Sequence, residues 1–300
     1  MPASHPPTHP THRLGNPLHN PPSLAKADFI EGLSKGLAVL ESFDTERQRL
    51  NATQAAARAG LTRAAARRHL LTLAHLGYLE TDGSHYWLSA KVLRFSGSYL
   101  ASARLPRLLQ PTLNRLAALT HASFSAVVLD GDEVVIVARS AAAGDQRVLA
   151  YGLHLGARLP VHATSTGRVL LAAQPRQVVS DWLTGRELPR LTPWTTVDAP
   201  ALHAAIAQAQ HDDHAVVCEE HELGVHALAV PLRNMQGHTV AALNAVAAPQ
   251  DRHTLAPAHA AANAVTGQGR PAEHGRMAAI LRQSLLPLLL DAARELRPLL

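Results

Sequence analysis

Residues 51–88 read NATQAAARAGLTRAAARRHLLTLAHLGYLETDGSHYWL, and this stretch decides the fold of the first part of the chain. A short helix is expected to end at Gly60, because glycine readily adopts the left-handed conformation that closes helices. Thr62 can cap a second helix over residues 63–76. Two helices joined by a three-residue turn indicate a helix-turn-helix.

The segment after the second helix predicts a β-hairpin. Residues 78–80 and 86–88 are short strand-like runs, and Asp82-Gly83 between them is a strong signal for a hairpin turn. A hairpin in this position is the wing of a winged helix-turn-helix.

The second helix has one apolar face and one basic face. At 100° per residue, Ala66, Leu70 and Leu73 fall on one side of it. Arg68 and Thr72 fall on the other side. Small residues let a helix enter the major groove of DNA, and arginines near its N-terminus can reach bases and phosphates. The candidate DNA-binding residues are Thr62, Arg63, Ala64, Arg67, Arg68, Thr72 and His85.

Arg63 and Arg68 are the strongest of these candidates, since Arg63 lies in the first turn and Arg68 points most squarely outward. For Arg67 two roles stay open, a contact to a DNA phosphate and an ion pair within the protein. The alternative is that the arginine pair only solvates an exposed face. The capping, turn and hairpin signals together favour DNA binding over that alternative.

Composition limits the classes to which the chain can belong. It has 300 residues, 47% of them hydrophobic and 17% charged, which predicts two globular domains. The net charge is +5, and from residue 58 to 94 six basic residues stand against two acidic ones, as nucleic-acid binding requires. No apolar run approaches the roughly 20 residues of a membrane span, so a cytoplasmic protein with no membrane partner is expected. A single cysteine, Cys218, argues against a disulfide framework or a multi-cysteine zinc site, and we expect no metal and no cofactor.

Four segments are expected along the chain. Prolines and histidines crowd residues 1–27, which predicts a disordered arm rather than a metal-binding helix. A helical apolar period over residues 29–44 precedes the helix-turn-helix, so the winged domain is placed at 28–89. A linker helix is predicted at 90–104 and a larger domain at 105–300.

The larger domain alternates strand and helix signals, and its strands come in hairpins. Asp130-Gly131-Asp132 and residues 233–237 read as hairpin turns, which predicts an α/β domain with a mostly antiparallel sheet. The predicted strands are 123–129, 133–138, 148–151, 158–160, 225–232 and 239–246. The predicted helices are 106–119, 166–173, 199–212 and 276–296, the last of them after a loop over 249–272.

Three stretches carry a family resemblance: LTRAAARRHLLTL (61–73) with the Leu-Gly-Tyr that follows at 76–78, LPVHATSTGR (159–168) and EHELGVHALAVPL (220–232). They resemble the IclR family of transcription regulators, especially the branch that controls the β-ketoadipate pathway of aromatic-acid breakdown. The resemblance covers about residues 29–296. It implies a winged helix-turn-helix that binds a double-stranded DNA operator, a GAF-like α/β effector domain, and assembly as a homodimer or tetramer.

The resemblance also implies a pocket for a small organic acid, aromatic or dicarboxylic. Its lining is expected to come from Thr164, Ser165, Thr166, Glu219, Glu220, Ala227 and Asn244. Ser165, Thr166 and the free N–H groups of the helix that follows form an anion site suited to a carboxylate. The alternative is that Thr164 and Ser165 only cap that helix, and the two roles can coexist.

The chain departs from this branch in two places. His226-Ala227 stands where the branch often carries Arg-Ser, which removes a hydroxyl and replaces a permanent charge with a titratable one. That change leaves the identity of the effector open. The loop over residues 256–272 is longer than the family's usual connection to its last helix.

Two other functions stay open at the level of sequence. Residues 163–167, Ala-Thr-Ser-Thr-Gly, approximate the G-x-S-x-G elbow of serine hydrolases, so an esterase that uses Ser165 is the enzymatic alternative. That fold needs a parallel sheet, which the hairpin signals disfavour. A thiol nucleophile at Cys218 with His221 as its base is also disfavoured, because the segment reads as a strand end and turn. The preferred prediction is a regulator, not an enzyme, of an aromatic-compound catabolic operon, and a repressor of an unrelated carbon-source operon is the other alternative.

Overall fold

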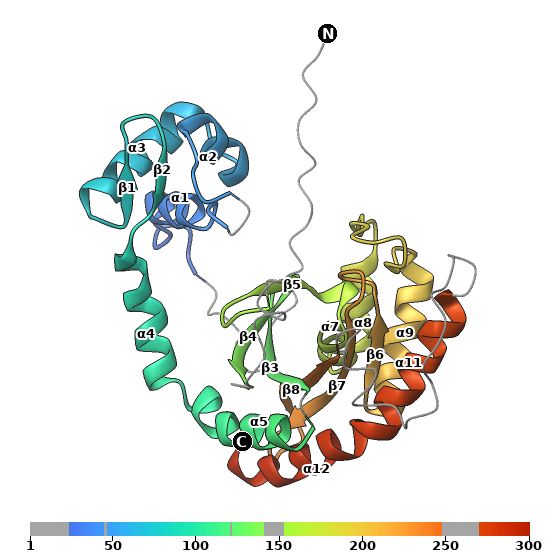
Figure 1. Cartoon of the computed structure of the whole chain (residues 1–300). Coiled ribbons are helices and arrows are strands. Elements are labelled where there is room, and N and C mark those ends of the chain that lie inside the picture. Colours follow the sequence, from blue (N-terminus) through green and yellow to red (C-terminus); the bar gives the residue numbers. More distant parts are fainter. Residues whose placement is uncertain (1–23, 45–46, 121, 141–152, 248–269) are drawn as a thin grey trace. The chain divides into compact units, whose positions relative to one another are not determined.

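The structure is a computed structural model that describes residues 24–44, 47–120, 122–140, 153–247 and 270–300. The chain divides after Ala103 into two compact units, and each is described by itself (Figure 1). Most of the predicted arm, the predicted strand at 148–151 and most of the loop at 256–272 lie outside the described residues.

The first unit is a winged helix-turn-helix followed by a helix. Asn51 caps α2 by accepting the N–H groups of Thr53 and Gln54, and Gly60 closes it at φ +65°. Leu50 exchanges backbone hydrogen bonds with Tyr86, which ties the start of α2 to the wing. The elements are α1 (Glu31–Leu40), α2 (Ala52–Ala59), α3 (Arg63–His75), β1 (Leu79–Thr81), β2 (Tyr86–Leu88), a 3₁₀ turn (Ala90–Val92) and α4 (Leu93–Ser102).

The first helix is shorter than the apolar period predicted, and most of its stripe does not reach the core. Val39 and Phe43 are buried with the side chains of α2, α3 and the wing. Phe29, Leu33 and Leu37 are instead 54%, 60% and 49% exposed. The apolar period therefore predicted a helix correctly, but it did not predict that much of the apolar face would be exposed in this chain.

The second unit is built on one six-stranded sheet in the order β5-β4-β3-β8-β7-β6, and every neighbouring pair is antiparallel. The predicted α/β fold with an antiparallel sheet is thus confirmed. Its strands are β3 (Ser123–Asp130), β4 (Glu133–Arg139), β5 (Arg158–Pro160), β6 (Ala215–Cys218), β7 (His226–Arg233) and β8 (Thr239–Ala247).

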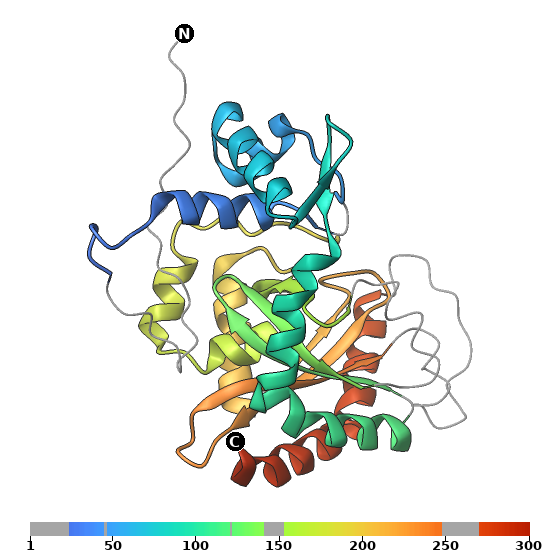
Figure 2. The same cartoon turned by 90° about the vertical axis from the view of Figure 1, so that its left-hand side faces the viewer.

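Helices cover both faces of this sheet. One core packs α5 (Arg104–Thr120), α11 (Arg270–Ser284) and α12 (Leu286–Leu296) on one face, and Figure 2 shows the green α5 and the red α12 side by side there. The other core packs α7 (Ser165–Ala172), α8 (Arg176–Leu183) and α9 (Ala199–Asp212) on the opposite face. Alternate residues of each strand therefore enter different cores.

Two helices of this unit differ from the sequence predictions. The single final helix predicted at 276–296 is two helices that meet at Leu285. Pro287 explains the break, because proline lacks the N–H that a continuous helix needs but fits the first turn of a new one. The short helix α8 was not predicted.

Candidate functional site

Helix α3 exposes the face that the sequence predicted. Thr62 caps it, accepting the N–H of Ala65 at 3.2 Å. Ala66, Leu70 and Leu73 are buried. The exposed residues on α3 and its cap include Thr62, Arg63, Ala64, Arg67, Arg68 and Thr72.

The basic residues near α3 fall into two groups. Arg58 is ion-paired with Asp44, and the ammonium of Lys91 donates to the carbonyl of Leu76 at 2.6 Å. By contrast, Arg63, Arg67 and Arg68 form no ion pair with any residue that the structure describes. The internal pair considered for Arg67 is therefore not found within the described chain, and all three guanidinium groups face solvent.

The wing carries a turn held by one carboxylate. Asp82 accepts the backbone N–H of Ser84 at 2.9 Å and that of His85 at 2.8 Å. These hydrogen bonds lower the pKa of Asp82 to about 2, so the turn keeps its anchor at any physiological pH. The side chain of His85 is half-buried, with Nδ1 at 2.9 Å from the hydroxyl of Ser84.

The second unit contains a cavity on the α7 side of the sheet. The space between its lining atoms, open solvent at the mouth included, is about 340 Å³. Of the seven predicted effector residues, Thr166 and Asn244 line it. The lining residues are Ser123, Phe124, Ser125, Val127, Ile136, Arg139, Leu153, Leu159, Thr166, Asn244 and Val246.

A row of three polar side chains crosses the sheet at this cavity. Arg139 on β4 is the register partner of Ser125 on β3, which is in turn the partner of Asn244 on β8. The hydroxyl of Ser125 donates to Oδ1 of Asn244 at 2.7 Å. The guanidinium of Arg139 donates to the carbonyl of Leu153. Sequence reasoning missed Arg139 and Ser125, although a charged residue ending the apolar strand at 133–138 was a usable signal.

The N-terminus of α7 confirms the capping role weighed for Thr164. Its hydroxyl oxygen accepts the N–H of Gly167 at 3.1 Å, and the hydroxyl donates to the carbonyl of Pro160 at 3.3 Å. Ser165 is 1% exposed, and its Oγ has no hydrogen-bond partner among the described residues. Neither Thr164 nor Ser165 is among the residues that line the cavity, whereas the next residue, Thr166, is.

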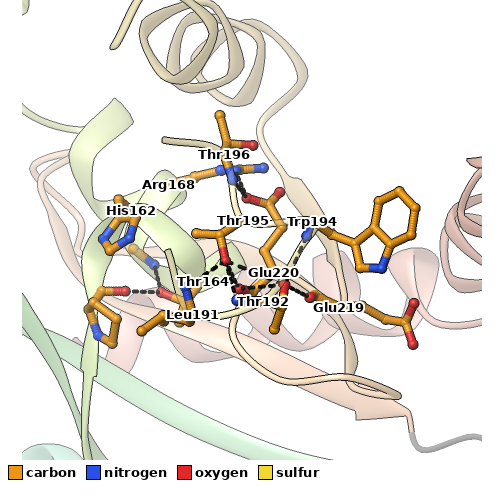
Figure 3. A network of polar contacts seen from close by, with 12 residues as sticks. His162, Thr164, Arg168, Leu191, Thr192, Trp194, Thr195, Thr196, Glu219 and Glu220 are labelled. Carbon is orange, nitrogen blue, oxygen red and sulfur yellow. Dashed lines mark hydrogen bonds and ion pairs between the residues drawn. The ribbon is translucent and has the colours of Figure 1, made fainter. Parts of the chain in front are cut away.

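The two predicted glutamates belong to a buried polar network next to α7 (Figure 3). Glu220 accepts from Nη2 of Arg168 at 2.6 Å and from the N–H of Thr196 at 2.9 Å. Glu219 accepts the N–H of Gly224 at 2.7 Å and lies 2.7 Å from Nε2 of His274 on α11. Neither glutamate lines the cavity, so the predicted effector set is divided between two places.

His226 and Ala227 lie on opposite faces of β7. The ring of His226 is buried on the α11 side, with its centroid 6.2 Å from that of His274. Ala227 packs against the core of the α7 side, the face that carries the cavity. Of the two departures from the branch at these positions, the histidine at 226 therefore lies on the face away from the cavity. Only the alanine at 227, which lacks a hydroxyl, lies on the face that carries the cavity.

The arrangement gives no support to nucleophilic catalysis. All the strand pairs of the described sheet are antiparallel, whereas the serine elbow needs a parallel sheet. Burial raises the pKa of the Cys218 thiol to about 11 and lowers the pKa of His221, so the thiol stays protonated. Within the described ranges no three histidine, cysteine or acidic side chains are grouped as metal ligands, and no helix is long and apolar enough to cross a membrane.

Each of the two units matches a known protein family. Residues 32–83 match the IclR helix-turn-helix domain, and residues 97–267 match the C-terminal domain of the bacterial transcriptional regulator IclR. The chain is 46% identical to the Pca operon regulatory protein of Acinetobacter baylyi, over 94% of this chain and 95% of that one. It is 51% identical to the p-hydroxybenzoate hydroxylase transcriptional activator of the same organism, over 75% and 84%. A crystal structure of a double mutant of the PobR inducer-binding domain from Acinetobacter, in complex with 3-hydroxybenzoic acid, matches 65% of this chain and 98% of that one, with 42% identity and a TM-score of 0.52. The chain belongs to the IclR family of bacterial transcriptional regulators, which bind DNA and are not enzymes.

Proposed function

We propose that this regulator controls a catabolic operon for aromatic compounds and that the cavity beside α7 binds an aromatic carboxylic acid. The observation that carries the proposal is the polar row of Arg139, Ser125 and Asn244 at an otherwise largely apolar cavity. Small-molecule sites commonly combine apolar walls with a few convergent polar groups. The name of the p-hydroxybenzoate hydroxylase transcriptional activator and the 3-hydroxybenzoic acid complex point to the same class of ligand.

The lining supports a specific pose for a hydroxybenzoate. The guanidinium of Arg139 offers the charge that a carboxylate needs, and arginine can bind a carboxylate through two parallel hydrogen bonds. Asn244 accepts from Ser125 through Oδ1, so its amide N–H groups stay available as donors. The aromatic ring then packs against Val127 and Ile136, which line the apolar part of the cavity.

The other predicted effector residues act around this pose. Thr166 lines the cavity from the first turn of α7 and offers a hydroxyl to the ligand. Thr164 caps α7. The buried hydroxyl of Ser165, next to Thr166 in sequence, makes no hydrogen bond to any described residue. Glu219 and Glu220 fix the neighbouring network, and Ala227 leaves room on the cavity's face.

The DNA-binding surface comprises the exposed residues of α3 and the wing. Arg63 and Arg68 are the proposed contacts to base edges or phosphates, with Arg67 on a phosphate. Thr62 and Ala64 allow close approach of the helix N-terminus to DNA, whereas the hydroxyl of Thr72 donates to the carbonyl of Arg68 at 2.9 Å. His85, in the turn of the wing, is the proposed contact from the wing to DNA.

Arg68→Ala is expected to weaken operator binding roughly 10-fold, because one good arginine contact is worth about 1–3 kcal/mol. Fluorescence anisotropy with labelled operator DNA measures the affinity over a range of salt concentrations. Arg176→Ala on α8, an exposed arginine in the other unit, is the matched control and should bind as the unsubstituted protein does. Unchanged affinity and salt dependence for Arg68→Ala would remove this residue from the interface.

A second copy of the chain is the proposed partner of the exposed stripe on α1. Leu33 and Leu37 are exposed one turn apart on α1, and the exposed Phe29 lies just before the helix. Exposed apolar residues grouped in this way are typical of an interface. A dimer of winged domains would read a pseudo-palindromic operator. Leu33→Glu with Leu37→Glu is expected to reduce the mass found by light scattering, while Leu223→Glu, at a single exposed leucine, should not. Equal masses for all three proteins would place the interface elsewhere.

Operator binding in the presence of ligand tests the proposed function as a whole. We expect 3-hydroxybenzoate or 4-hydroxybenzoate to change the operator affinity, because an effector that binds one state better shifts the population of the regulator. A sugar acid of similar charge is the control and represents the alternative of an unrelated carbon-source operon. A response to the sugar acid alone would select that alternative.

A further inference from the structure

Lys91 lies at the junction between the recognition helix and the helix that follows the wing. Its Nζ donates to the carbonyl of Leu76, the C-cap of α3, at 2.6 Å. The same Nζ lies 4.7 Å from the centroid of the Tyr78 ring. A cation at a helix C-terminus and a cation over an aromatic face are both stabilising, and here one ammonium makes both contacts.

Further contacts fasten the same junction. Ser89 donates through Oγ to the carbonyl of Gly77 at 2.5 Å and through its N–H to the carbonyl of Tyr78 at 2.9 Å. Its hydroxyl oxygen also accepts the N–H of Lys91 at 3.2 Å, which caps the 3₁₀ turn leading into α4. The ring of Phe95 on α4 stacks on that of Tyr78 with centroids 5.7 Å apart. The last turn of α3 is thus joined to the first turn of α4 by side chains as well as by the wing.

We propose that Lys91 is a positioning residue for DNA recognition, which locks α3 to the start of α4 so that the recognition helix follows any movement of α4. The inference depends on α3 being the helix that reads DNA. It also removes Lys91 from the DNA contacts, although its charge counts toward the basic excess of the sequence. An ammonium already held by a carbonyl and a ring would have to give up both contacts to reach a phosphate.

Two outcomes separate a positioning residue from a phosphate contact. Loss of a phosphate contact lowers the slope of log affinity against log salt by about 1, whereas loss of a positioning contact lowers affinity at an unchanged slope. Arg94→Met is the matched control, because Arg94 is an exposed residue on α4 with no ion pair to any described residue.

The experiment measures operator binding by the full chain with Lys91→Met, which keeps most of the length of the side chain but removes the charged donor. We expect roughly a fivefold loss of affinity at an unchanged salt slope, a weaker change of affinity on adding 4-hydroxybenzoate, and partial rescue by Lys91→Arg. Phe95→Ala, at a side chain 62% exposed, tests the same junction in case Lys91→Met does not fold. A lower salt slope, or unchanged affinity and ligand response in both variants, would overturn the proposal. Failure of Arg68→Ala to weaken binding would instead contradict the assignment of α3.

Discussion

Gly167→Ala is expected to destabilise the second unit by about 3 kcal/mol. A Cβ at position 167 would lie 2.0 Å from the carbonyl oxygen of Val161 and 2.5 Å from its Cα. Both atoms are backbone, so no side chain can swing aside to make room. The turn before α7 and the helix itself would have to separate, next to the cavity.

Denaturant unfolding followed by circular dichroism measures this effect. Gly275→Ala in α11 is the matched control, because a Cβ there meets nothing within 4 Å. That substitution should stabilise by roughly 0.5–1 kcal/mol, as is usual when alanine replaces glycine inside a helix. Equal unfolding midpoints for the two variants would show that α7 does not depend on this close approach.

Arg139→Gln is expected to weaken binding of a hydroxybenzoate roughly 100-fold, because it leaves a carboxylate in the cavity without its counter-charge. Glutamine keeps N–H donors but is shorter than arginine and carries no charge. Isothermal titration calorimetry of the full chain gives the affinity. Operator binding without ligand should be unchanged, which separates loss of the ligand from loss of the fold.

Arg176→Gln serves as the control for a general change of charge and should bind the ligand normally. Methyl 4-hydroxybenzoate, which has no carboxylate, should bind weakly and equally to the unsubstituted protein and to Arg139→Gln. If both proteins bound 4-hydroxybenzoate with the same affinity, the carboxylate would have another partner, and Thr166 with Asn244 would be the next candidates.

Local sequence signals predicted the winged helix-turn-helix well, because the groups that shape it are close together in sequence. Thr62 caps the helix that it begins, and Gly60 closes the helix before it. Helical periodicity alone predicted which face of α3 is exposed, because Leu70 and Leu73 on the opposite face pack into the core of the first unit. The exposed stripe on α1 could not be recognised in the same way, because periodicity does not say whether a face packs within the chain or against another copy.

The cavity was predicted only in part, because its polar row is assembled by pairing between distant strands. Ser125 and Asn244 are 119 residues apart in sequence and become neighbours only when β8 pairs with β3. The spacing of residues within a short stretch cannot reveal a pairing between distant strands, so Arg139 and Ser125 were not predicted. Thr166 and Asn244 were predicted only through the family resemblance. The same sheet explains why His226 lies away from the cavity, since neighbouring residues on a strand face opposite sides.

Direct titration of the full chain with 4-hydroxybenzoate tests whether the cavity binds an aromatic acid. We expect saturable binding at one site per chain, with a matching rise in thermal stability as the ligand concentration passes the dissociation constant. We also expect 3-hydroxybenzoate to compete for the same site. Absence of both heat and stabilisation with either acid, in a preparation that still binds operator DNA, would contradict the assignment of the cavity to an aromatic acid.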